Sequence, residues 1–180
     1  MQKAAAVFNF ERLDFVNGWY IRHLKVGDVA ERMRPYLEAA QLPLAEYPPE
    51  YVLSVAALLQ ERLKHFDETE ELAWFFFKRP VADATLRELI VPKKSTWEET
   101  VPILKEASEL LAGLTTADWT QSSLEEKLRA FIETKELKPA QVLWPIRAAL
   151  TGSPASPGSF EMLNALGQAE SILRLRAVLQ

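Results

Sequence analysis

Residues 141 to 160 read QVLWPIRAALTGSPASPGSF, and this stretch decides how the C-terminal part of the chain folds. Its first half carries apolar residues on every side of a 3.6-residue period, with Arg147 as the only charge, which is typical of a buried helix. Pro145 lies inside this helix, lacks an N–H and crowds the carbonyl four residues back. The segment therefore predicts a kinked helix with a free carbonyl group at Gln141.

The second half of the stretch predicts an abrupt end to that helix. Thr151 and Gly152 terminate it, and residues 153 to 159 form a stiff loop of small residues rich in proline and serine. Phe160 then opens a new apolar segment. Backbone groups in this loop are expected to remain accessible.

Working outward, helical spacing of apolar residues recurs along the chain, and strict alternation is almost absent. This predicts an all-α protein, a bundle or cage of about ten helices in two subdomains, residues 1–118 and 119–180, because residues 113 to 123 are rich in turn-forming residues. The expected helices are 12–24, 28–40, 49–66, 70–77, 82–90, 97–111, 124–134, 139–150, 160–166 and 168–179.

Several helix starts carry capping residues. Ser95 with Glu98 and Ser123 with Glu126 have capping-box spacing, and Pro48-Pro49 can open the third helix. The run Trp74-Phe75-Phe76-Phe77 is expected in the core. Arg174 and Arg176, two apart on the last helix, are expected on the surface.

Composition excludes several kinds of site. The chain has no cysteine, which excludes disulfides, iron–sulfur clusters and thiolate zinc sites, and its two histidines are far apart, which argues against a metal site. No apolar run approaches the roughly 20 residues that span a bilayer, and no signal-peptide pattern opens the chain. We expect a cytoplasmic, monomeric protein without a membrane partner. Its net charge of -4 restricts any nucleic-acid contact to a local site.

Two arginines are unusual in their surroundings. On a helical wheel for the third helix, Arg62 falls inside the apolar arc. There it either extends to solvent or pairs with a carboxylate, or it sits at the edge of a groove to bind a base. Arg147 lies three residues after Trp144, so the two are neighbours on one helix face. Trp144 is either a core residue or a platform on which a base stacks.

The quoted stretch resembles the LWPxRxALTG segment and the following S/T-P-G loop of the anticodon-binding region of bacterial-type glutamyl-tRNA synthetases. Residues 6–13 and 17–22 are similar to that family's AVFDxxKLxWxNxxYI block, which follows its catalytic half. Further similarity covers residues 60–64, 75–77, 166–168 and 172–179. Asn9 stands where the family usually has aspartate, and residues 66–68 also depart from its pattern.

The resemblance implies a role for each candidate site residue. The first subdomain would contact the tRNA stem and part of the anticodon, with Arg62 reading the third anticodon base. The second subdomain would line the anticodon pocket. The implied tRNA-binding residues are Arg62, Trp144, Arg147, Ser156, Pro157, Ser159 and Phe160.

The resemblance also implies partners and cofactors. The chain has no glycine-rich phosphate loop and neither the HIGH-like nor the KMSKS-like motif, so no catalysis is expected from it. Its partners would be the tRNA(Glu) anticodon loop and the catalytic domain of the same polypeptide. The parent enzyme would attach glutamate to tRNA(Glu), and ATP and Mg²⁺ would bind its catalytic half, leaving no cofactor or metal here. The alternatives are the corresponding domain of a class I lysyl-tRNA synthetase and a helical protein-interaction module.

Overall fold

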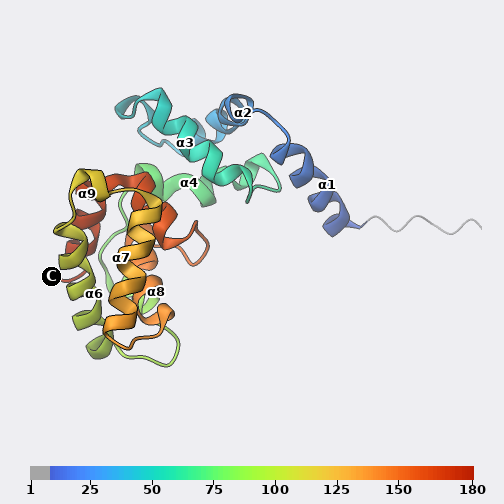
Figure 1. Ribbon diagram of the computed structural model, residues 1–180. Helices are drawn as coiled ribbons and strands as arrows, with labels where there is room; N and C mark the ends of the chain where they lie inside the picture. Colours follow the sequence, from blue (N-terminus) through green and yellow to red (C-terminus); the bar gives the residue numbers. More distant parts are fainter. Residues whose placement is uncertain (1–8) are drawn as a thin grey trace, which may run out of the picture. The chain divides into compact units, whose positions relative to one another are not determined.

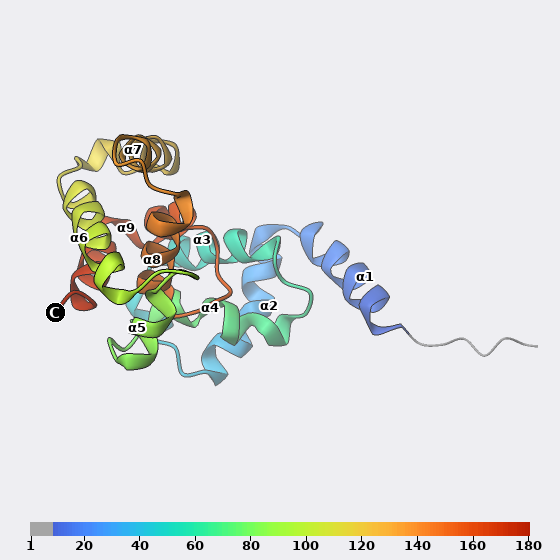
Figure 2. The same cartoon turned by 90° about the horizontal axis from the view of Figure 1, so that it is seen from below.

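The computed structural model describes residues 9–180, so residues 6–8 of the similar N-terminal block lie outside the described part. Contacts within the chain divide it into two compact units, Met1–Trp74 and Phe75–Gln180. The described residues contain nine α-helices, three short 3-10 helices and no strand, which confirms the all-α prediction (Figures 1 and 2).

Unit 1 centres on a pair of packed helices, α2 and α3. Its buried side chains include Met33, Leu37 and Leu59, all without solvent exposure. The elements of this unit are α1 (Phe10–Arg22), α2 (Val26–Ala39), η1 (Leu44–Glu46), α3 (Pro49–Gln60), η2 (Phe66–Glu68) and the first part of α4 (Thr69–Phe77). Pro49 occupies the first turn of α3, as predicted, because proline needs no N–H there.

Unit 2 is built around α9, which packs against α6, α7 and α8, while α8 also packs against α5 (Figure 1). Phe75, Phe76 and Phe77 at the end of α4 are buried, as expected for core residues. The remaining elements are α5 (Ala84–Ile90), α6 (Trp97–Ala112), η3 (Thr116–Asp118), α7 (Gln121–Thr134), α8 (Pro139–Thr151) and α9 (Ser159–Ala177). Within residues 9–180, no helix has the length and apolarity needed to cross a membrane.

Three predicted boundaries were wrong. The third helix ends at Gln60 rather than Phe66. The capping boxes predicted at Ser95 and Ser123 do not start α6 and α7. Thr96 forms a capping box with Glu99 at the start of α6, and the Thr120 side chain caps α7 by accepting from the backbone N–H of Ser123. Adjacent hydroxyl residues compete for the N-cap position, so spacing alone left these two starts ambiguous.

The helices predicted at 160–166 and 168–179 join into α9 across a kink at Gly167. This residue has φ 75° and ψ 169°, a conformation that is open essentially only to glycine. The two predicted helices are therefore present, with the bend where the sequence placed their boundary.

The division of the chain differs from the predicted one near residue 118. Helices α5 and α6 precede that position but pack on α8 and α9. The turn-rich segment before α7 contains the η3 turn, and Trp119 beside it donates a 3.0 Å hydrogen bond from Nε1 to the carbonyl oxygen of Leu163 in α9. Turn-forming composition there marks a connection inside unit 2.

Candidate functional site

Helix α8 and the loop after it build a hollow on unit 2. The helix continues through Pro145 and ends at Gly152, whose φ of 59° is the left-handed conformation common just after a helix. Ser159 then donates a 2.7 Å hydrogen bond from Oγ to the carbonyl oxygen of Leu143, which fixes the start of α9 against the middle of α8. The hollow, about 400 Å³, is lined by Pro139, Ala140, Leu143, Trp144, Arg147, Gly158, Ser159 and Phe160.

Trp144 is fixed at its edge and covered on one face. Its indole Nε1 donates a 2.7 Å hydrogen bond to the carbonyl oxygen of Leu89 in α5. The Arg147 guanidinium lies over the ring, with Cζ 4.6 Å from the centroid. This is cation–π geometry, so the Trp144 ring stabilises the Arg147 guanidinium in its position over the ring.

Arg147 is half-buried and lines the hollow. Its Nη2 donates a 3.2 Å hydrogen bond to the carbonyl oxygen of Pro154 in the loop. Burial lowers the pKa of Arg147, but a guanidinium still stays charged at neutral pH. No carboxylate contributes to that shift, so among the described residues this cation lacks an acidic partner. A partly desolvated cation of this kind favours a ligand rich in acceptor oxygens or nitrogens.

The loop positions have structural roles of their own. Ser156 is half-buried and its Oγ donates to the carbonyl oxygen of Pro157, 3.2 Å away, while Pro157 is buried. Neither residue lines the hollow. Ser159 lines the hollow but is only 6% exposed, and its hydroxyl already donates a hydrogen bond to the carbonyl oxygen of Leu143. The structure thus brings Trp144, Arg147, Ser159 and Phe160 together, with Ser156 and Pro157 in the adjoining loop.

Arg129, which the sequence analysis did not select, lies beside the hollow without lining it. It lies on α7, with Cζ 5.8 Å from the centroid of the Phe160 ring, which itself lines the hollow. Its guanidinium also pairs with Glu125, with 2.6 Å between Nη2 and Oε1. In the sequence the two residues look like an ordinary surface pair four apart, and only the packing of α7 on α9 brings Arg129 to Phe160.

Arg62 belongs to unit 1 and lies beyond the end of α3. The wheel argument is therefore wrong, because the residue is not in the helix. It is exposed, and its Nη1 donates a 3.3 Å hydrogen bond to the carbonyl oxygen of Leu58 in the last turn. A side chain that reaches back to a last-turn carbonyl also helps to end the helix.

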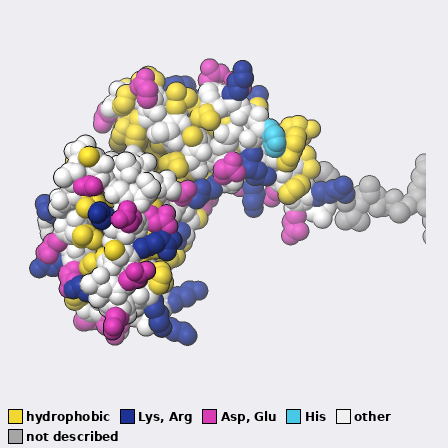
Figure 3. All heavy atoms as spheres, in the orientation of Figure 1, with side chains coloured by type: hydrophobic (Ala, Val, Ile, Leu, Met, Phe, Trp, Pro, Cys, Tyr) yellow, Lys and Arg dark blue, Asp and Glu magenta, His cyan; other side chains and the backbone are white. Residues whose placement is uncertain are grey.

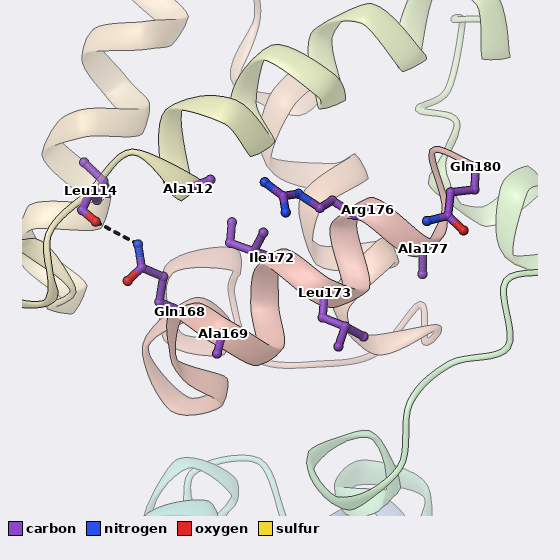
Figure 4. A pocket seen from close by; sticks show the side chains of 9 residues that line it. All are labelled: Ala112, Leu114, Gln168, Ala169, Ile172, Leu173, Arg176, Ala177 and Gln180. Carbon is purple, nitrogen blue, oxygen red and sulfur yellow. Dashed lines mark hydrogen bonds between the residues drawn. The ribbon is translucent and has the colours of Figure 1, made fainter.

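A larger hollow of about 770 Å³ lies beside α9 (Figure 4). None of the predicted site residues lines it, and its walls are mostly aliphatic: Ala112, Leu114, Gln168, Ala169, Ile172, Leu173, Arg176, Ala177 and Gln180. The Gln168 side chain donates a 2.8 Å hydrogen bond from Nε2 to the carbonyl oxygen of Leu114. Without an aromatic plane on which a base could stack, it suits a nucleic-acid loop less well than the hollow on α8.

Within residues 9–180, no group of three or more acidic, cysteine or histidine side chains could hold a metal ion.

Comparison with known proteins finds relatives of the chain along nearly its whole length. Glutamate–tRNA ligases are similar to almost the whole chain: that of Chloroflexus aurantiacus is 36% identical over 183 residues, covering 99% of this chain and 36% of that protein. The ligase of Roseiflexus castenholzii is 39% identical over 182 residues, covering 99% and 35%. That of Thermus thermophilus is 38% identical over 176 residues, covering 96% and 35%.

Among solved structures, a glutamate tRNA ligase from Elizabethkingia meningosepticum in complex with its amino acid has a TM-score of 0.77. It is 21% identical, and the match covers 99% of this chain and 34% of that chain, which shows a shared fold. The chain thus spans about a third of the length of the curated relatives it matches. The family model described as an anticodon binding domain matches residues 28–179. The expected resemblance is thereby confirmed, and this chain belongs to the anticodon binding domain family, in which its relatives are glutamate–tRNA ligases.

Proposed function

We propose that this domain binds the anticodon loop of tRNA(Glu) for a glutamate–tRNA ligase. The observation that carries the proposal is Arg147, a half-buried cation without an acidic partner among the described residues, held over Trp144 at the edge of a hollow. The volume of about 400 Å³ lies within the range of about 300–1,000 Å³ typical of small-molecule sites, so one unstacked base can enter.

The geometry suggests how a base would be bound. Because Arg147 covers one face of Trp144, the base stacks on the guanidinium plane or on the Phe160 ring. When the base stacks on Phe160, the N–H groups of Arg147 donate to acceptor atoms on its edge, a contact that contributes about 1–3 kcal/mol of discrimination. Arg129, beside Phe160, is placed to neutralise a neighbouring phosphate.

The role within a ligase is positional. The relatives extend well beyond the matched third, and they are glutamate–tRNA ligases. In a protein of that kind, binding free energy at the anticodon helps to align the acceptor end of the tRNA in the catalytic part. By the same proposal, ATP and Mg²⁺ bind the catalytic part of such a ligase, which lies outside the matched third.

Fluorescence anisotropy with labelled anticodon hairpins tests the proposal. We expect this chain to bind a tRNA(Glu) hairpin more tightly than a tRNA(Lys) or an unrelated hairpin, with an affinity that falls as salt rises. Arg147→Ala should weaken binding by about 1–3 kcal/mol. Arg87→Ala is the matched control, because Arg87 lies 5.6 Å from the Trp97 ring in the same unit but outside the hollow.

The relatives favour the glutamate over the lysine hairpin, since they are glutamate–tRNA ligases. Tighter binding to the tRNA(Lys) hairpin would support the lysyl alternative. Equal, weak binding to all three hairpins, unaffected by Arg147→Ala, would contradict the proposal and support a protein-interaction module.

A further inference from the structure

The residues that end α8 form a closed ring of hydrogen bonds through Arg147. The Arg147 guanidinium donates from Nη2 to the carbonyl oxygen of Pro154, 3.2 Å away, and the Arg147 backbone carbonyl oxygen accepts a 2.8 Å hydrogen bond from Oγ1 of Thr151. Oγ1 of Thr151 in turn accepts from the backbone N–H of Ser153, the residue just before Pro154. The main chain and the side chain of Arg147 are therefore both bound to one short segment, residues 151–155.

Two buried hydroxyl groups fix this segment. Thr151 has no solvent exposure and Ser153 is only 8% exposed, although the next two residues, Pro154 and Ala155, are exposed. Oγ of Ser153 donates a 2.8 Å hydrogen bond to the carbonyl oxygen of Ala155 and accepts one of 3.1 Å from its N–H. The N–H of Ala155 and the carbonyl group of Pro154 belong to the same peptide plane, so the Ser153 hydroxyl orients the carbonyl group that receives Arg147.

The Arg147 guanidinium is fixed but still has donors for a ligand. The Trp144 ring lies against its face and the carbonyl oxygen of Pro154 lies at one edge. A guanidinium has five N–H groups, and among residues 9–180 only this one hydrogen bond uses them. An arginine side chain has many rotamers, so fixing it before a ligand arrives lowers the entropy cost of binding.

The placement of this guanidinium matters more than the total charge. The chain has a net charge of -4, and Figure 3 shows Lys and Arg side chains interspersed with Asp and Glu over the face of unit 2 that is seen there. A face of mixed charge provides little of the broad positive field that attracts nucleic acid from a distance. The affinity of a base for the hollow then depends on whether Arg147 is correctly placed.

We propose that Thr151 and Ser153 are positioning residues, which hold the Arg147 guanidinium in the geometry that binds a base. The proposal rests on the function proposed above. Neither residue lines the hollow, and both hydroxyl groups are bonded to backbone groups. They act on the ligand only through the segment 151–155 and its bond to Arg147.

A double-mutant cycle, measured by fluorescence anisotropy with the tRNA(Glu) hairpin, tests this proposal. Thr151→Val removes the hydroxyl at nearly constant size and should weaken hairpin binding about three- to tenfold, the range expected for one hydrogen bond. In the Arg147→Ala background the same change should alter binding by less than about twofold, because the residue through which it acts is gone. Thr151→Ser keeps the hydroxyl and should retain most of the affinity. Ser153→Ala, at a loop position outside the helix, should weaken binding in the same way as Thr151→Val.

Thr100→Val is the matched control. Thr100 lies in α6 of the same unit and is 1% exposed, and its Oγ1 donates a 2.7 Å hydrogen bond to the carbonyl oxygen of Thr96, four residues before it. It does not line the hollow. Urea denaturation should show that Thr100→Val and Thr151→Val lose stability to a similar extent, whereas hairpin affinity should fall only in Thr151→Val.

The possible failures are distinguishable. A wild-type chain that does not bind the hairpin, or binding that Arg147→Ala leaves unchanged, would contradict the proposed function and this inference with it. Binding that Arg147→Ala weakens but Thr151→Val and Ser153→Ala leave unchanged would overturn only the inference. So would equal weakening by Thr151→Val in the wild-type and Arg147→Ala backgrounds, or the same weakening by Thr100→Val, since either result would mean a general loss of structure.

Discussion

Arg129 is shared between the Phe160 ring and a carboxylate of its own helix. Glu125 Oε1 lies 2.8 Å from its Nε and 2.6 Å from its Nη2, so an RNA phosphate must compete with this carboxylate. Glu125→Gln removes the competing charge at constant size. We expect hairpin binding to tighten by about 0.2–1 kcal/mol, the range measured for exposed ion pairs, with a steeper salt dependence.

Anisotropy titrations at several salt concentrations measure this effect. Glu126→Gln is the control, because Glu126 is an exposed carboxylate of the same helix. Equal affinities for the Glu125→Gln variant and the wild type would show that Arg129 does not contact RNA.

Arg62 combines two possible roles that a single substitution can separate. Its Nη1 reaches the carbonyl oxygen of Leu58, yet the side chain is exposed on unit 1. Arg62→Gln should reduce discrimination between hairpins that differ only at the third anticodon base by about 1–3 kcal/mol. The free energy of unfolding should change by less than about 1 kcal/mol, as is usual at an exposed position.

Paired titrations with the two hairpins, and urea unfolding, measure both quantities. Arg34→Gln, at another exposed arginine of unit 1, should change neither by more than about 0.5 kcal/mol. If Arg62→Gln lowers stability but leaves discrimination intact, the residue only caps α3.

At the scale of single helices, the sequence predicted where apolar stripes lie better than where helices end. The third helix was extended to Phe66 because Leu63 continues the apolar spacing. The chain instead leaves the helix after Gln60, and the Leu63 amide bonds back to the carbonyl oxygen of Leu59, which still buries the Leu63 side chain completely. Both conformations bury the same residue, so periodicity cannot distinguish them. Gly152, by contrast, ended α8 as predicted, because its left-handed φ favours glycine.

The attachment of α1 is expected to depend on pH through His65. Its hydrogen bond with Asp14 is the main reason why the pKa of His65 is raised, and the charges of Asp14, Asp67 and Glu68 add to the effect. A raised pKa in the folded state means that the charged form stabilises the fold. This contribution is complete below the unfolded pKa of about 6.5 and is lost as pH rises through the folded value.

Hydrogen exchange of the α1 amides between about pH 5 and 8, corrected for intrinsic rates, measures this dependence. Protection should fall as pH rises, and Asp14→Asn should flatten the curve. His23→Gln is the control, because His23 stacks on Trp19 and takes no part in the pair with Asp14. The same pH profile in the Asp14→Asn variant would contradict this role for His65.

At the scale of the whole molecule, the helical class was predicted from the sequence, and the hollow on α8 is lined by Trp144, Arg147, Ser159 and Phe160 of the predicted site residues. The two compact units of the structure do not coincide with the predicted subdomains. The division falls inside α4, between Trp74 and Phe75, where an uninterrupted apolar helix gives no sign of a boundary. Arg147 could be selected because a charge among apolar residues is conspicuous in a sequence. Arg129 could not, because its contact with Phe160 exists only once α7 and α9 pack together.

Arg174 is the clearest case of a whole-molecule role that the sequence concealed. It was expected on the surface, and this was wrong: the side chain is 3% exposed. Its Nη1 donates 2.6 Å hydrogen bonds to the carbonyl oxygens of Phe75 and Leu150, in the last turns of α4 and α8. Its Nε donates to Glu170 at 2.8 Å, so one guanidinium ties α9 to α8 and to the end of α4 that belongs to unit 2.

Arg174→Met keeps much of the side-chain volume but leaves two helix-end carbonyls and the half-buried Glu170 without this donor. We expect the free energy of unfolding to fall by about 2–4 kcal/mol, since each orphaned buried acceptor costs about 1–3 kcal/mol. Urea denaturation measures the loss. Arg79→Met removes the other, exposed partner of Glu170 and should cost less than about 1 kcal/mol. Equal losses in the two variants would mean that the carboxylate pairing, rather than the bonds to the ends of α4 and α8, accounts for the stabilisation by Arg174.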